Sequence, residues 1–323
     1  MSSHDAAAIA EPADHDRNDQ RAGSLAGVVA YSLWGVFPLV FHQLEEVGAG
    51  EILAHRIVWA FVVVVALLAI RRERHWFAGV RATQGALPRL SAAAVLVGTN
   101  WLVYIWAVNH GHVVEAALGY YINPLLTVAL GVVVLGEHLR RLQVAAIGLG
   151  AVAVAVLTLA YGRVPWVALV LASTFAAYSF LKKAVPVGAV TSLATETLVL
   201  LPVAATTLVV LEVRGTGALG HGSAGRDLLL VSLGAVTAVP LILFGVAARR
   251  IPLSLLGLLQ YLTPTLQLVC GVALLGEALP PARLAGFVLV WAALAVLAAD
   301  ALGFARRRAA EPVSLPPPAA EAA

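Results

Sequence analysis

The chain has 323 residues, of which 60% are hydrophobic and 12% are charged, which is about half the charged share of soluble domains. This composition excludes a disordered chain, a coiled coil and an ordinary soluble enzyme, because a surface in contact with water needs far more charge. The net charge of +3 does not indicate nucleic-acid binding, since the basic residues lie in short clusters between apolar runs.

Ten apolar windows follow one another along the chain, and most are long enough to cross the hydrocarbon core of a membrane as helices. Residues 1–22 and 305–323 are rich in charge, Ala or Pro, and we expect both to be disordered tails. The predicted spans are residues 24–43, 50–70, 90–108, 114–136, 142–161, 164–181, 190–211, 228–247, 253–276 and 283–303.

The loops between the windows predict the orientation of the chain. If the N-terminus is cytoplasmic, most of the Lys and Arg residues fall in the inside loops. The outside loops then hold only Arg163, Arg214, Arg226 and Arg283. Cytoplasmic loops are enriched in basic residues, so both termini are expected on the cytoplasmic side.

The chain repeats itself at an offset of 140 residues. Residues 118–137 read LGYYINPLLTVALGVVVLGE, and residues 258–277 read LLQYLTPTLQLVCGVALLGE. The repeat spans an odd number of helices, so its two halves, residues 23–162 and 163–304, must be inverted relative to each other. In many secondary transporters such inverted repeats enclose the substrate site near the middle of the membrane.

The residues also resemble a known family. The strings AYSLWGVFP (30–38), EILAHRIVW (51–59), NWLVYIWAVN (100–109) and EAALGYYINPL (115–125) are similar to the drug/metabolite transporter superfamily, its EamA-type domains and, more closely, the RarD group. GEHLRR (136–141), ETLVLLP (196–202) and QYLTPTL (260–266) match as well. The resemblance implies an all-α membrane protein of ten helices and a multi-pass permease of the bacterial inner membrane, of the kind labelled chloramphenicol-sensitive protein.

Three functions remain open on the sequence. The first is a secondary transporter that moves a small amphipathic organic solute outward by alternating access, with proton coupling as an addition. The second is a membrane scaffold or sensor that does not transport, and the third is an intramembrane lipid-modifying enzyme. The chain has no P-loop, GxSxG or HExxH motif. We therefore expect no enzyme, cofactor or metal. The expected partners are the solute, the lipid bilayer, protons and a second copy bound through the fifth and tenth helices.

Two charged residues lie within predicted spans and are candidates for substrate binding or coupling. Glu196 is either a protonatable carboxylate or a headgroup-level carboxylate near Lys182 or Lys183. Arg56 aligns with Glu196 in the repeat, but the inversion places Arg56 near the outer side and Glu196 near the inner side, so we expect no salt bridge between them. Arg56 is expected to meet Glu51, Glu115 or an anionic substrate group, or else to extend to the interface.

Further candidates are polar or aromatic residues in the spans. His55 could titrate in the working range or be structural. Asn100 and Tyr104 share a helix face and form either a cavity wall or a helix–helix contact. Tyr121, Asn123, Gln260 and Tyr261 surround the repeated prolines Pro124 and Pro264, and we expect a matched pair of kinked helices there.

Glu137 and Glu277 end the two repeated segments. A carboxylate at the C-terminal end of a helix is electrostatically unfavourable, so each needs a compensating group. We expect Arg140 or Arg141 to compensate Glu137, and Arg283 to compensate Glu277, with structural roles for both pairs.

Overall fold

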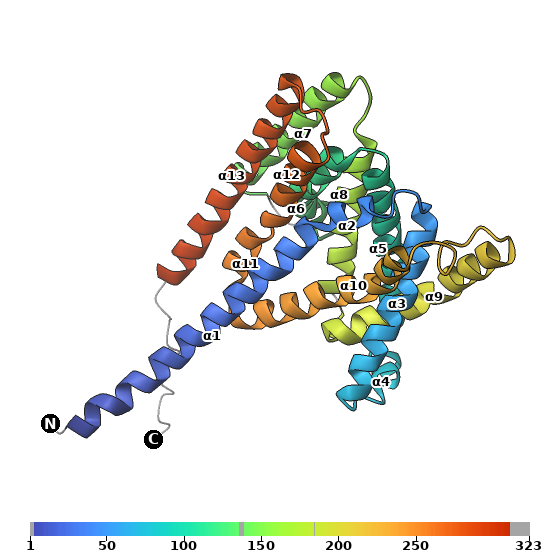
Figure 1. The fold of residues 1–323 in the computed structure, drawn as a ribbon. Helices are drawn as coiled ribbons and strands as arrows, with labels where there is room; N and C mark the ends of the chain where they lie inside the picture. The colour runs from blue at the N-terminus through green and yellow to red at the C-terminus, as the bar shows by residue number, and fades with distance from the viewer. Residues whose placement is uncertain (1–2, 136–138, 184, 311–323) are drawn as a thin grey trace.

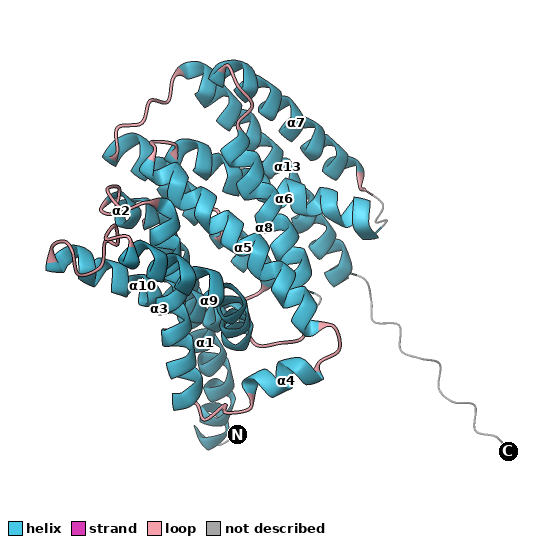
Figure 2. Ribbon diagram, turned by 90° about the vertical axis from the view of Figure 1, so that its right-hand side faces the viewer, coloured by secondary structure: helices cyan, strands magenta, loops and turns pink. Residues whose placement is uncertain are grey.

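The computed structural model describes residues 3–135, 139–183 and 185–310. The described chain consists of helices and connecting loops, without strands (Figure 2). The helices are α1 Ser3–Gly35, α2 Phe37–His42, α3 Ala49–Ile70, α4 Trp76–Ala82, α5 Ala86–Asn109, α6 Val113–Leu135, α7 Arg141–Tyr161, α8 Trp166–Lys183, α9 Ala189–Val213, α10 Ala224–Arg250, α11 Leu253–Leu259, α12 Leu262–Val269, the π-helical turn η1 Cys270–Leu274 and α13 Pro281–Ala310.

The protein is an all-α membrane protein, as the sequence predicts, and each predicted window coincides with helix. Among the described residues, nine helical segments are long and apolar enough to span a membrane. The window at 164–181 corresponds to α8, an 18-residue helix that is not one of the nine. Helix α8 packs against both α5 and α6 and buries Val167, Leu171 and Ala176. Because much of it faces protein rather than lipid, it can be less apolar than its neighbours.

The packing of the helices follows the repeat. Helix α3 packs on α9, α6 on α12, and α7 on α13, so each of these helices meets its own counterpart in the other half. Two further contacts also match across the repeat, because α1 packs on α10 just as α8 packs on α5. Figure 1 shows α7 and α13 side by side, away from α3 and α9. A two-fold relation between the halves requires this pattern, and the ten helices form two inverted five-helix repeats.

The proline-containing helices of the two halves differ. Helix α6 runs through Pro124 from Val113 to Leu135. Its counterpart is interrupted at Gln260 and Tyr261, between α11 and α12, and Pro264 lies in the first turn of α12. Proline is tolerated in a first turn, where its missing N–H has no intrahelical acceptor. The sequence predicts two matching kinked helices. The structure instead has a continuous helix in the first half and a broken helix in the second.

The N-terminal segment also differs from the expectation of a disordered tail. Helix α1 begins at Ser3, so residues 3–22 are helical and continue into the first span (Figure 1). This segment is rich in Ala, the residue with the highest helix propensity, and an existing helix extends more easily than a new one nucleates. At the other end α13 reaches Ala310, and residues 311–323 lie outside the described residues.

Candidate functional site

Arg56 lies two turns into α3 and is buried, with 4% of its surface exposed. Its Nε donates a hydrogen bond to Oγ1 of Thr237 in α10 at 3.0 Å. The guanidinium lies over the ring of Trp101 in α5, 4.1 Å from the centroid, and 5.6 Å from the rings of both Phe37 and Phe41 in α2. A buried cation therefore sits in an aromatic enclosure to which both halves of the protein contribute.

The two carboxylates expected to pair with Arg56 are engaged elsewhere, so that expectation is wrong. Glu51 accepts a hydrogen bond from the backbone N–H of Ala218, in the loop between α9 and α10. Glu115 accepts two from Arg163, from Nη2 at 2.6 Å and from Nη1 at 3.3 Å. Among the described residues, Arg56 has no carboxylate within 4.0 Å.

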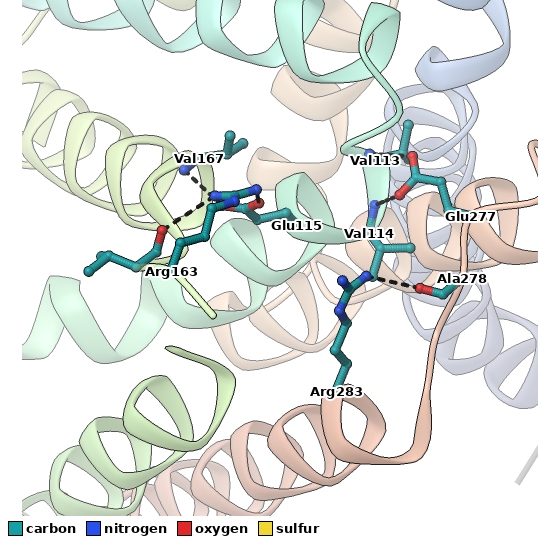
Figure 3. Close-up of polar contacts among 9 residues, drawn as sticks. Val113, Val114, Glu115, Arg163, Val167, Glu277, Ala278 and Arg283 are labelled. Carbon is teal, nitrogen blue, oxygen red and sulfur yellow. Dashed lines mark hydrogen bonds and ion pairs between the residues drawn. The ribbon is translucent and has the colours of Figure 1, made fainter. Parts of the chain in front are cut away.

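Glu115 is 1% exposed and lies in the first turn of α6 (Figure 3). Besides Arg163, it accepts a hydrogen bond from the backbone N–H of Val167 at 3.0 Å, near the start of α8. The carboxylate thus combines an ion pair with the favourable position at a helix N-terminus. It joins α6 in the first half to α8 in the second.

Asn100 and Tyr104, which the sequence predicts on one face of α5, lie beside the aromatic enclosure. Asn100 donates through Nδ2 to the carbonyl of Leu171 and to Oγ1 of Thr174, both at 3.0 Å, and its Oδ1 accepts from the hydroxyl of Tyr120 at 3.1 Å. The ring of Tyr104 packs edge-on between Phe41 and Tyr120, with centroids 6.0 and 5.8 Å away. The hydroxyl of Tyr104 is buried and has no hydrogen-bond partner among the described residues.

Glu196 occupies in α9 the position that Arg56 occupies in α3, and it is 1% exposed. Its Oε1 lies 3.1 Å from Nζ of Lys182 and accepts from Oγ of Ser192 at 2.9 Å. Its Oε2 accepts from the hydroxyl of Tyr178 at 3.1 Å, and Lys182 also donates to that hydroxyl. The carboxylate is therefore buried in the protein and paired with Lys182.

The chain is similar to known transporters over nearly all its length. Residues 21–159 match the EamA-like transporter family. Protein RarD of Streptomyces exfoliatus is 50% identical over 312 residues, which cover 95% of this chain and 99% of that protein. The chain belongs to the EamA/RarD group of drug/metabolite transporters. An uncharacterized transporter of Pseudomonas aeruginosa is 42% identical, with coverage of 89% and 96%. A solved crystal structure shares the fold at 21% identity, with a TM-score of 0.57 and coverage of 85% and 96%.

The remaining residues predicted for this EamA/RarD protein lie apart from the enclosure. Tyr121 belongs to a second apolar cluster with Phe287, and its hydroxyl hydrogen-bonds to Oγ1 of Thr265 in α12 at 2.7 Å. Tyr261 packs against the same cluster, and Gln260 precedes it at the break between α11 and α12. Asn123 is partly buried, and its Oδ1 has no partner. Tyr121 and Tyr261 therefore meet in one cluster at the α6–α12 contact, apart from Arg56.

His55 is 3% exposed and neighbours Arg56 in α3. Its Nε2 lies 3.9 Å from Oε1 of Glu51, and its Nδ1 has no hydrogen-bond partner. The indole N–H of Trp59, one turn further along α3, is likewise buried without a partner. This face of α3 therefore presents several polar groups whose hydrogen bonds the described protein does not supply.

The compensation predicted for Glu277 is wrong. Its carboxylate accepts hydrogen bonds from the backbone N–H groups of Val113, at 2.5 Å, and Val114, at 2.8 Å, at the start of α6 (Figure 3). Arg283 instead donates to the carbonyl of Ala278 and lies over the ring of Tyr161, 4.2 Å from its centroid. The positive end of α6 takes the role expected of the arginine. Glu137 lies outside the described residues, and Arg140 pairs with Asp300 at 2.6 Å.

Several residues of the enclosure were not singled out by the sequence. Tyr120 precedes the repeated Tyr121, and only its neighbour carried the repeat signal. Phe37 and Phe41 read as ordinary apolar residues, and Thr237 as one polar residue in an apolar window. The one property that these residues share in the sequence is that all of them lie within predicted spans. Which of them face Arg56 depends on the packing of α2, α6 and α10.

Proposed function

We propose that this protein is a secondary active transporter of a small amphipathic organic solute, and that it works by alternating access between its inverted halves. The observation that supports this most is the enclosure of Arg56 by Trp101, Phe37 and Phe41, with Tyr104 beside it, because it combines one charge with aromatic walls. Ligand sites of this kind are mostly apolar with a few fixed polar groups. An ionisable group buried in a span is costly, which argues for a function and against a passive scaffold.

Contacts between the halves at both ends of the helices support the alternating-access part. At the end where α3 begins, Glu51 binds Ala218 and Glu277 binds the start of α6. At the other end, Val80 and Leu90 cluster with Val185, in the connection between α8 and α9. Arg56, Phe41 and Tyr104 are buried and Trp101 is partly buried, so the enclosure is largely shielded from both sides in this arrangement. Access from either side requires one set of contacts to separate while the other holds.

The proposal also covers the orientation of the chain in the membrane, the coupling of transport to protons and the oligomeric state. Both termini are cytoplasmic, as the distribution of basic residues predicts, and the membrane is the bacterial inner membrane, as the resemblance to the RarD group implies. Protons drive transport through Glu196, which binds a proton when its contact with Lys182 opens. The chain acts as a transporter and not as an enzyme. A homodimer forms through α7 and α13, whose exposed apolar residues include Val152, Leu159 and Val288.

The test compares cells that lack the gene with cells that express the protein or its Arg56→Gln variant, at equal levels in the membrane. Metabolites and toxic compounds inside and outside the cells are measured by an untargeted survey, so that no compound is chosen beforehand. Compounds whose distribution changes are then tested in proteoliposomes by counterflow and under an imposed pH gradient. We expect compounds that the intact protein moves and the variant does not. If reconstituted, folded protein moves none of the compounds that change in cells, the transport proposal fails.

A further inference from the structure

We propose that Arg56 binds the anionic group of the solute, so that the substrates are organic oxyanions with a single charge and an apolar ring. This inference rests on the proposed transport function and narrows it to one substrate class. It follows from the charge balance inside the protein, from the hydrogen-bonding capacity left at Arg56, and from the side chains that line the enclosure.

The charge balance singles out Arg56. Three of the four buried carboxylates among the described residues pair with a cation: Glu115 with Arg163, Glu196 with Lys182, and Asp300 with Arg140. The fourth, Glu51, accepts from the backbone N–H of Ala218 and lies 3.9 Å from Nε2 of His55, which is a counter-charge only when it is protonated. Arg56 is as deeply buried as these groups, yet its protein acceptor is the neutral hydroxyl of Thr237. A buried charge without a counter-charge is destabilising by several kcal/mol. An anion that binds there would offset this cost, whereas a cation would add to it.

The hydrogen-bonding capacity agrees with the charge. A guanidinium carries five N–H donors in a planar fork that matches the two oxygens of a carboxylate or phosphate. At Arg56 one of them, Nε–H, donates to Thr237, whose own hydroxyl donates onward to the carbonyl of Leu233 at 2.8 Å. The terminal Nη groups have no acceptor among the described residues. The hydroxyl of Tyr104, which packs against Phe41 as Arg56 does, is a further unpartnered group.

The side chains that line the enclosure indicate the chemical nature of the rest of the solute. Trp101 and Phe41 present ring faces to the guanidinium, and Tyr104 and Tyr120 continue the aromatic surface toward Asn100. A planar apolar ring packs well on such a surface. Among the described residues, a second negative charge would find no unpaired Lys or Arg beside Arg56, because Lys182 and Arg163 are paired with carboxylates. One oxyanion on one ring is the solute that fits both the charge and the walls.

The experiment measures binding to the purified full chain in detergent, at constant ionic strength, by the ligand-induced shift in thermal unfolding. Benzoate is compared with its neutral analogue benzamide, with the cation benzylamine and with acetate, which lacks the ring. Phenyl phosphate, measured at a pH where it carries one charge, separates phosphate from carboxylate recognition. The variants are Arg56→Gln, Arg56→Lys and, as a matched control, Arg71→Gln, which changes an exposed arginine at the other end of α3.

We expect benzoate or phenyl phosphate to bind at least about tenfold more tightly than benzamide or acetate, the effect of one charge-assisted pair. Arg56→Gln should remove this preference, Arg56→Lys should weaken it, and Arg71→Gln should leave it intact. Should Arg56→Gln fail to fold, the ligand comparison on the unchanged protein still decides. Equal binding of benzoate and benzamide, or an anion preference that survives in Arg56→Gln, overturns the proposal. If the transport test shows flux of a neutral or cationic solute, the anion proposal is overturned while the transport function stands. If anions bind but no solute is moved, the transport function is overturned instead.

Discussion

Gly234 in α10 lies directly against the backbone of Trp59 in α3. A Cβ at position 234 would come 2.5 Å from the carbonyl carbon of Trp59 and 2.9 Å from its Cβ, closer than real side chains approach. This close approach holds α10 where Thr237, one turn further on, reaches Arg56. The contact between α3 and α10 therefore positions the hydrogen bond between the buried cation and Thr237.

We expect Gly234→Ala to lower the free energy of unfolding by about 1–3 kcal/mol, as overpacking does, and to reduce transport. Gly245→Ala is the matched control, because it lies in the same helix and a Cβ there meets nothing within 4 Å. The control should be neutral or more stable by up to about 1 kcal/mol, since Ala favours helix over Gly. Thermal unfolding in detergent measures both, and equal effects of the two changes would refute the close-packing argument.

The pair of Glu115 and Arg163 gives a second prediction. Arg163→Gln leaves a carboxylate buried with only the backbone N–H of Val167, while Arg163 itself is 38% exposed. Because this exposure screens the pair, we expect a loss of about 1–3 kcal/mol rather than the larger cost of a fully buried pair. Glu115→Gln combined with Arg163→Gln should be more stable than Arg163→Gln alone. A double variant that is less stable than either single one would contradict this explanation in a double-mutant cycle of thermal unfolding.

Glu277 gives a third prediction, since it caps the start of α6 from the other half of the protein. Glu277→Ala removes the acceptor and should destabilise the protein by about 0.5–2 kcal/mol, the usual effect of losing an N-cap. Glu277→Gln keeps an acceptor oxygen but loses the charge, so its stability should lie between those of the unchanged protein and Glu277→Ala. Glu73→Ala, at an exposed carboxylate after α3, is the control and should have little effect. If Glu277→Ala behaves like Glu73→Ala in thermal unfolding, the cap does not stabilise the fold.

The helical layout was accessible from the sequence for a simple reason. Lipid requires each span to be long, apolar and internally hydrogen-bonded, so the spans are visible one by one. The repeat then related them in pairs, and the packing of α3 on α9 and of α7 on α13 agrees with it. The break between α11 and α12 was not visible, because Pro124 and Pro264 occupy equivalent positions while only one of the two helices is interrupted.

The partners of the candidate residues were less accessible. Arg56 and Glu196 stood out because a charge within a span is rare. Their partners did not, since Thr237 is 181 residues from Arg56 and is one of several threonines in apolar windows. Tyr121 carried the repeat signal, but consecutive helix residues point about 100° apart, and it is Tyr120 that binds Asn100. Contacts between distant helices depend on their rotation about their own axes, which hydropathy alone does not determine.

The contact between Glu196 and Lys182 leads to the last prediction, on proton coupling. Nζ of Lys182 lies 3.1 Å from Oε1 of Glu196, so under the proposed coupling a proton on this carboxylate takes the place of the lysine. Lys182→Met removes this cation and leaves the hydroxyls of Tyr178 and Ser192 at the carboxylate, so the pH dependence of counterflow should differ from that of the unchanged protein. Glu196→Gln should abolish that dependence, and Lys183→Met, at the exposed neighbouring lysine, should leave it unchanged. Flux of the identified solute is measured in proteoliposomes at a series of pH values from about 5 to about 9. Coupling through Glu196 is refuted if Glu196→Gln keeps the pH dependence of the unchanged protein.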